Sequence, residues 1–126
     1  MSRFAIKNLM EVEDSGPIDE IEGRFGRKHL DSEHLGVSYF RYAPGFHSRA
    51  GHHHQTQEEA YVVVGGSGRV RLDDEVVELK RWDALRVAPE VVRAFEAGPG
   101  GLEFIAVGAD RPEGGDGVMV RDFWTD

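Results

Sequence analysis

The sequence of 126 residues contains no cysteine. This absence excludes disulfide bridges, zinc sites built on thiolates, cysteine nucleophiles and iron–sulfur clusters held by cysteine. Long apolar runs are also missing, since the longest, residues 60–64, is far shorter than the roughly 20 residues that a membrane helix requires. The N-terminal stretch MSRFAIKNLMEVED lacks the apolar core of a signal peptide and becomes acidic early. These absences predict a cytoplasmic protein without a membrane partner.

Positive charge is scarce as well. Fifteen Lys and Arg residues against 23 Asp and Glu residues give a net charge of −8. No basic stretch interrupts this balance, which argues against a nucleic-acid partner because such proteins carry a basic surface. The hydrophobic content of 40% is too high for a disordered chain and is sufficient for one domain with a buried core. Glycine, with 16 residues, is nearly twice as frequent as usual and predicts many tight turns between short strands.

From Leu35 onward the polar and apolar residues alternate with a period of two, as in half-buried β-strands. Turn signals such as Pro-Gly, Gly-Gly and Asp-Asp recur about every 8–12 residues, which is typical of a β-sandwich or β-barrel. The expected strands cover residues 37–42, 58–64, 69–72, 75–80, 84–88, 91–95, 102–107 and 118–120, with turns at 65–68, 98–101 and 114–117.

The N-terminal third has a weaker pattern. Residues 4–9 are expected to form a first strand. Apolar residues spaced three and four apart between residues 17 and 30 favour one short helix, although Gly23 and Gly26 weaken that expectation.

Two of the expected strands are apolar on both faces. Residues 60–64 and 102–107 place apolar side chains at consecutive positions, whereas a strand buried on one side only would alternate. The outer face of the sheet is therefore expected to be covered, either by the N-terminal segment or by a second subunit in a homodimer.

The densest polar cluster is GHHHQTQEE, residues 51–59. On an extended chain His52 and His54 share one face, and His53 points away from it. Glu59, at the start of the next strand, is expected to face the same interior. Two imidazoles and one carboxylate that converge form a three-ligand site for Zn, Fe, Mn, Ni or Cu, with positions left open for water or substrate. The alternative is a polar loop whose histidines are solvated.

The stretch PGFHSRAGHHHQTQEEAYVVVGGSG, residues 44–68, resembles the first signature of the cupin superfamily. That signature contains a glycine, an HxH motif, a glutamate three or four residues later, and a glycine six residues after the glutamate. The matching residues are Gly45, His52, His54, Glu59 and Gly66. Glu58 with Gly65 fits the shorter spacing equally well, so the glutamate has two candidates, of which Glu59 aligns better with the strand that follows.

The second cupin signature matches residues 82–95 less well. Pro89 and Phe95 resemble its proline and its aromatic residue, but Trp82 and Glu90 replace two glycines. Arg93 stands where the resemblance places the third metal-binding histidine of the family.

Arg93 leaves the presence of a metal open. A guanidinium stays protonated and has no lone pair to donate, so Arg93 is not a metal ligand. Its strand parity places it inside the barrel. There it would either form an anion site with His52 and His54, suited to a carboxylate or phosphate, or pair with Glu59 in a structural remnant. A metal site completed by water or by His47 is the other alternative, and we weigh the two states equally.

The resemblance is greatest to small single-domain, conserved-barrel (type 2) cupins. It implies an all-β fold, a double-stranded β-helix or jelly-roll barrel, with little helix. The whole chain, 1–126, is expected to form one such domain, with its core at about residues 35–110 and an N-terminal extension at 1–34.

The same resemblance implies a protein that binds a small molecule in the barrel beside a divalent metal on His52, His54 and Glu59. Dioxygenase- or isomerase-like chemistry would follow, although whether the protein is an enzyme is left open. Arg93, Tyr61 and Phe95 are the expected ligand-binding residues, and Arg93 favours an anionic ligand. The alternatives are a metal-free protein that binds a small acid or sugar derivative, and a non-catalytic dimerisation module.

Overall fold

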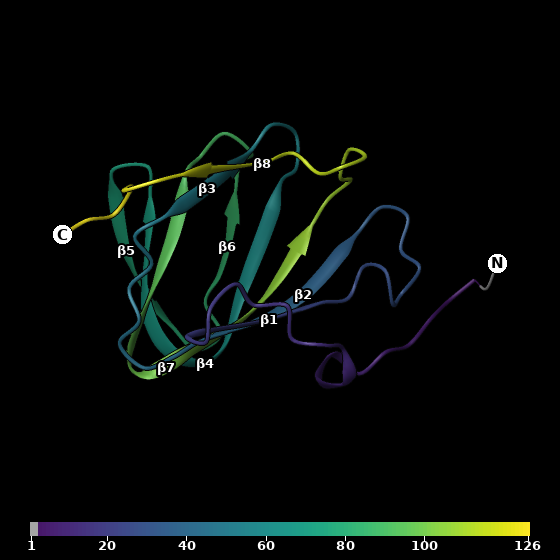
Figure 1. The fold of residues 1–126 in the computed structure, drawn as a ribbon, viewed down its shortest axis with the longest axis horizontal. Helices are drawn as coiled ribbons and strands as arrows, with labels where there is room; N and C mark the ends of the chain where they lie inside the picture. The colour runs from purple at the N-terminus through teal and green to yellow at the C-terminus, as the bar shows by residue number, and fades with distance from the viewer. Residues whose placement is uncertain (1–2) are drawn as a thin grey trace.

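The computed structural model describes residues 3–126, which fold into a curled sheet of β-strands (Figure 1). The strands are β1 (Ile21–Phe25), β2 (Gly36–Tyr42), β3 (Gly51–His54), β4 (Glu59–Leu72), β5 (Glu75–Lys80), β6 (Ala84–Val87), β7 (Arg93–Gly108) and β8 (Gly117–Val120). Among these residues the only helix is a single 3-10 turn, η1 (Leu9–Glu11). An all-β barrel with little helix is thus confirmed. No helix in this part of the chain has the length and apolar character needed to span a membrane.

All strand pairs in the sheet are antiparallel. One path runs β1–β2–β7–β3–β8, while β4 pairs with β5, β6 and β7. Strand β7 belongs to both halves of the sheet. Its residues 102–108 pair with β2 on one edge and β4 on the other, and its first residue, Arg93, pairs with His52 of β3. The strands therefore enclose a shared interior, and β3 meets the start of β7 at one end of it.

The long strands β4 and β7 each join two segments that the sequence predicts as separate strands. The predicted turns at residues 65–68 and 98–101 are wrong, because both strands continue through them. The pairing register shifts within the first stretch, so its glycines form bulges instead of ending the strand. Gly66 has a φ of +69°, and a Cβ there would lie 2.0 Å from the carbonyl oxygen of Gly101. Only glycine allows these two strands to approach so closely.

The N-terminal third also differs from the sequence prediction. Residues 4–8 have no regular structure, and the helix expected within residues 17–30 is replaced by the edge strand β1, which pairs with β2. Gly23 lies opposite Phe40, and a Cβ at Gly23 would be 3.2 Å from the Phe40 ring. The Phe25 ring then meets Phe40 edge-on at a centroid distance of 5.4 Å. Contacts with β2 thus override the helical spacing of the apolar residues.

Aromatic side chains dominate the core of the barrel. Phe95 and Phe104 stack with ring centroids 4.5 Å apart, and Phe40 stacks on Phe104 at 5.4 Å. Tyr61 meets Phe95 edge-on at 5.1 Å. Such ring pairs contribute about 0.5–1.5 kcal/mol each beyond the burial of their surface. The other buried core residues are Val63, Val70, Leu79, Val87, Ala97, Leu102 and Ala106.

The outer face of the same sheet is only partly covered. In residues 60–64 and 102–107 the inward side chains are buried, whereas the outward ones are half-exposed. Residues 3–8 run away from the sheet (Figure 1), and Phe4 and Ile6 are 78% and 90% exposed. A homodimer that covers this outer face stays a prediction.

Candidate metal centre

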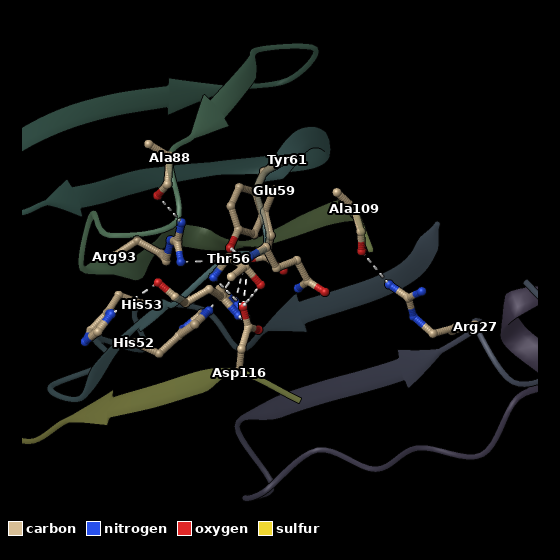
Figure 2. A network of polar contacts seen from close by, with 12 residues as sticks. Arg27, His52, His53, Thr56, Glu59, Tyr61, Ala88, Arg93, Ala109 and Asp116 are labelled. Carbon is tan, nitrogen blue, oxygen red and sulfur yellow. Dashed lines mark hydrogen bonds and ion pairs between the residues drawn. The ribbon is translucent and has the colours of Figure 1, made fainter. Parts of the chain in front are cut away.

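A cavity of about 430 Å³ lies inside the barrel, against the aromatic core. Polar side chains gather where β3 and the starts of β4 and β7 meet (Figure 2). The residues with polar side chains that line the cavity are Arg27, Ser38, Tyr42, Ser48, His52, His54, Gln57, Glu59, Tyr61, Arg93, Arg111 and Asp116.

The side chains of His52, His54 and Glu59 converge at this end. The Nε2 atoms of His52 and His54 lie 3.6 Å and 3.2 Å from Glu59 Oε1. One candidate ligand atom from each residue falls within 4.8 Å of the other two. Two donors that each lie about 2.1 Å from a tetrahedral ion are about 3.4 Å apart. The observed spacing therefore suits a single divalent metal ion.

The neighbouring residues with the same chemistry lie elsewhere. His53 does not line the cavity. Glu58 is exposed and its Oε2 accepts a hydrogen bond from Arg86 at 3.1 Å. The alternation along β3 and the start of β4 thus brings Glu59, and not Glu58, to the histidine pair.

His54 is held in one orientation by Asp116, which precedes β8. The His54 Nδ1–H donates to Asp116 Oδ1 at 2.8 Å. The other ring nitrogen, Nε2, is turned toward Glu59 and is buried without a hydrogen-bond partner among the described residues. A carboxylate behind a histidine in this way is the usual support of a metal-binding imidazole.

Asp116 is not among the site residues expected from the sequence. It lies in the glycine-rich stretch 114–117, and a turn was the only role predicted there. Its Oδ2 accepts hydrogen bonds from the backbone N–H groups of Thr56 and Gln57, each at 2.8 Å. Burial opposes ionisation, but these bonds and the one from His54 outweigh it and hold the pKa of Asp116 well below its usual value. The one local sign of this role in the sequence is an acidic residue among glycines, directly before an expected strand.

Glu59 is surrounded by hydrogen-bond donors and positive charge. Tyr61 donates its hydroxyl hydrogen to Glu59 Oε1, and Arg93 NH1 lies 3.9 Å from the same oxygen. Burial alone would raise the pKa of Glu59, but the hydrogen bonds from His52 and Tyr61 and the charges of the histidines lower it to about 2. Glu59 is therefore an anion at all physiological pH values.

Arg93 lies inside the barrel, as its strand parity predicts, and is 0% exposed. One of its terminal nitrogens, NH2, donates to the backbone carbonyl of Ala88 at 3.1 Å. Its Nε and NH1 atoms are buried without a hydrogen-bond partner within residues 3–126. Unpaired buried donors are costly, so this guanidinium is poised to bind an acceptor.

Tyr61 and Phe95 line the same cavity as Arg93. Burial, and then the nearby Glu59 charge, raises the pKa of Tyr61 well above its usual value, so its phenol stays neutral and acts as a donor. Phe95 presents its ring as part of the apolar wall.

His47 does not complete the cluster. Its Nδ1 contacts Glu96 Oε2 at 2.6 Å and its Nε2 donates to the carbonyl oxygen of Trp124 at 2.8 Å. Both ring nitrogens are thus engaged outside the cavity. The idea that His47 supplies a further ligand is not supported by this geometry.

The comparison with protein families agrees with the geometry. A family model described as "Cupin domain" matches residues 38–108, more than half of the chain. This chain belongs to the cupin superfamily. No curated protein matches the sequence.

Solved cupin structures share the fold at low sequence identity. A cupin protein from Bacteroides fragilis superposes with a TM-score of 0.72 at 22% identity, over 87% of this chain and 86% of the other. KdgF from Halomonas sp. gives 0.71 at 17% identity, over 90% and 98%. Streptomyces Pac13 with uridine, described as a nucleoside dehydratase, gives 0.75 at 19% identity, over 93% and 91%. At these identities the likeness establishes the fold of this cupin and not its reaction.

Proposed function

We propose that this cupin holds a divalent metal ion on His52, His54 and Glu59 and binds a small molecule beside it. The observation that carries the proposal is His54, whose Nε2 is buried without a partner and faces Glu59 because Asp116 occupies the other ring nitrogen. A metal ion would give this nitrogen its missing partner. The donor set, two imidazoles and one carboxylate, fits Zn, Fe, Mn, Ni or Cu.

The residues around the triad support binding of an anionic small molecule. When bound, the metal would supply Lewis-acid polarisation of an oxygen of that molecule. Arg93 offers two donors without partners to an acidic oxygen. Tyr61 keeps its proton and orients the Glu59 carboxylate. The aromatic wall excludes water from one side of the cavity, which strengthens each of these polar contacts.

Several reactions are compatible with this site. The cupin resemblance implies dioxygenase- or isomerase-like chemistry, and structures similar to this chain include a nucleoside dehydratase and an oxalate decarboxylase from Bacillus subtilis. A shared barrel hosts different reactions, so the proposal extends to metal-assisted chemistry on a small acid and no further.

Elemental analysis of protein purified without an affinity tag tests the metal. We expect about one equivalent of a transition metal, lost in both His52→Ala and His54→Ala. The matched control is His53→Ala, which removes an imidazole from the same strand without touching the cavity and should retain the metal. Native protein that takes up no metal during purification or on titration would overturn the proposal.

A metal-free acid-binding protein is the second candidate, and Arg93 favours it. Its guanidinium is 3.9 Å from Glu59 and would repel a nearby metal ion. Thermal-shift assays with small carboxylates, run on protein stripped with a chelator, distinguish the two candidates. Undiminished stabilisation after stripping favours the metal-free protein, because ligand binding to the native state raises its stability.

A further inference from the structure

The cavity has a second charged end that the proposed metal site does not use. Arg27, just after β1, and Arg111, in the loop between β7 and β8, line the same cavity as Glu59. In Figure 2, Arg27 lies on the far side of Glu59 and Tyr61 from Arg93. The cavity therefore carries arginine at both of its ends, in a protein whose net charge is −8.

Arg27 is held in place by the fold. Its NH2 donates to the backbone carbonyl of Ala109 at 2.9 Å. Gly36 leaves the room for it, since a Cβ at that position would lie 2.7 Å from the guanidinium. A half-buried guanidinium anchored at one nitrogen keeps its other donors in a defined direction, which is what recognition of a carboxylate or phosphate requires.

Arg27 and Arg111 define the outer end of the cavity, and neither forms an ion pair with a carboxylate in the part of the chain that the structure describes. Within residues 3–126 no carboxylate comes within ion-pair distance of Arg27 or Arg111, whereas the nearby Arg24 and Arg41 both pair with Glu22. Asp31 lines the recess outside Arg27 without pairing with it. Two unpaired guanidinium groups at one opening attract an anion.

Apolar side chains make up a large part of the cavity wall. Among them are Phe40, Phe104 and Ala106, beside the polar side chains of Ser38 and Gln57. The apolar part of the wall offers dispersion contact and suits the carbon skeleton of a ligand.

We propose that the ligand is an elongated small acid that carries a carboxylate or phosphate at its outer end, bound by Arg27 and Arg111. Its other end places an acidic oxygen at Arg93 and the histidine cluster, and its carbon skeleton lies along the aromatic wall. The inner contact rests on the proposed function; the outer contact does not depend on a metal.

Calorimetric titration of the metal-loaded protein with paired acids of equal length tests this proposal. The pairs are succinate with butyrate, glutarate with valerate, and adipate with hexanoate; phosphonate analogues of the best diacid distinguish phosphate from carboxylate. At the best length we expect the diacid to bind about tenfold or more tightly than its monoacid, as a charge-assisted hydrogen-bonded pair provides. Arg27→Gln should abolish that preference and leave the monoacid unchanged, and Arg111→Gln should reduce it.

Arg121→Gln is the matched control, since it removes one exposed arginine outside the cavity and should retain the full preference. Equal binding of diacid and monoacid at every length, or an unchanged preference in both Arg27→Gln and Arg111→Gln, would overturn the proposal. Repeating the titration on chelator-stripped protein distinguishes the two proposals. If the protein cannot bind metal but still prefers the diacid, and this preference depends on Arg27, only the proposed metal site is refuted. If the protein binds metal but shows no preference for the diacid, only the outer anion site is refuted.

Discussion

The inner end of the cavity, where the histidines and Arg93 lie, has two adjoining walls of opposite chemistry. On the wall of β3 and β4, His52, His54 and Glu59 follow the cupin pattern and bring one candidate ligand atom each to the same place. On the adjoining start of β7, which pairs with β3, Arg93 occupies the place of a further ligand and presents N–H donors without partners. A metal ion would be attracted by the first wall and repelled by the second.

This difference underlies the proposal that the site holds a metal cation and an acidic ligand together. Glu59, on the first wall, contacts both histidines and lies 3.9 Å from Arg93 on the second. An acidic ligand beside the metal would accept hydrogen bonds from Arg93 and offset the repulsion between Arg93 and the ion. Metal and ligand should therefore each strengthen the binding of the other.

The largest expected effect comes from the β4 wall. Glu59→Gln removes the acidic ligand, and we expect divalent-metal affinity to fall by about 100-fold or more, because even residues behind the ligands are worth about 10–100-fold. Glu58→Gln makes the same change one residue earlier, on an exposed side chain, and should leave the affinity unchanged. Equal losses in the two variants, measured by calorimetric metal titration, would show that the metal does not bind between the walls.

Asp116→Asn should weaken metal binding by about 10–100-fold, because an amide orients the His54 imidazole less strongly than a carboxylate does. Asp122→Asn is the control, as Asp122 is exposed, contacts Arg49 at 3.7 Å and does not line the cavity. Melting temperature is measured in parallel. A loss of stability with unchanged metal affinity would mean that Asp116 only anchors the loop before β8.

Arg93→His tests the second wall, at the start of β7, directly. We expect metal affinity to rise about tenfold or more, because the substitution removes a buried cation and adds an imidazole, while binding of small carboxylates weakens. Arg93→Met removes the charge without adding a ligand and separates the two causes. Calorimetry that finds the same metal affinity in wild type, Arg93→His and Arg93→Met would show that the two walls act independently.

The lowered pKa of Glu59 predicts how stability depends on pH. The folded pKa of about 2 lies below the ordinary value of 4.5, so the charged carboxylate stabilises the native state above pH 4.5. This contribution is lost as the pH falls from 4.5 to about 2. Urea unfolding of metal-free wild type and Glu59→Gln should therefore show a difference in unfolding free energy that shifts in favour of Glu59→Gln over this window. A constant difference across the window would contradict the assigned pKa.

Substitutions on the outer face of β4 and β7 are expected to have the smallest effect on the cavity. We expect a homodimer that buries about 1,000 Å² or more in total over this face. Val62→Glu, on the half-exposed outer side of β4, should give a monomer by light scattering. Val77→Glu, an equivalent change on the exposed strand β5, should not. A wild-type monomer at all dilutions would rule out the dimer, and metal binding should be similar in both variants.

Much of the inner end was predictable from the sequence because it depends on local periodicity. Alternation along an extended chain places His52 with His54 and turns His53 away. The same parity places Arg93 inside the barrel with Phe95. The tandem glutamates were resolved only by the fold, in which Glu59 enters the cavity and Glu58 pairs with Arg86.

The segments whose structure differs from the sequence-based prediction differ for one physical reason. Glycine at 65–68 permits a turn and a bulge equally, and the pairing between β4 and β7 decides for the bulge. The helical spacing near Ile21 was overruled by the contact of β1 with β2. Local preferences of about 1 kcal/mol or less per residue yield to such tertiary contacts.

Three features follow from local periodicity, because a period of two within a strand sets which side chains face inward: the all-β class, the strand face of the histidine pair and the burial of Arg93. Residues that come together from far along the chain depend instead on how the sheet folds. Asp116 lies 62 residues from His54, and Arg27, after β1, lines one cavity with Arg111, which lies in the loop between β7 and β8. No local period relates such residues, since their proximity arises from the curling of the sheet around its shared interior.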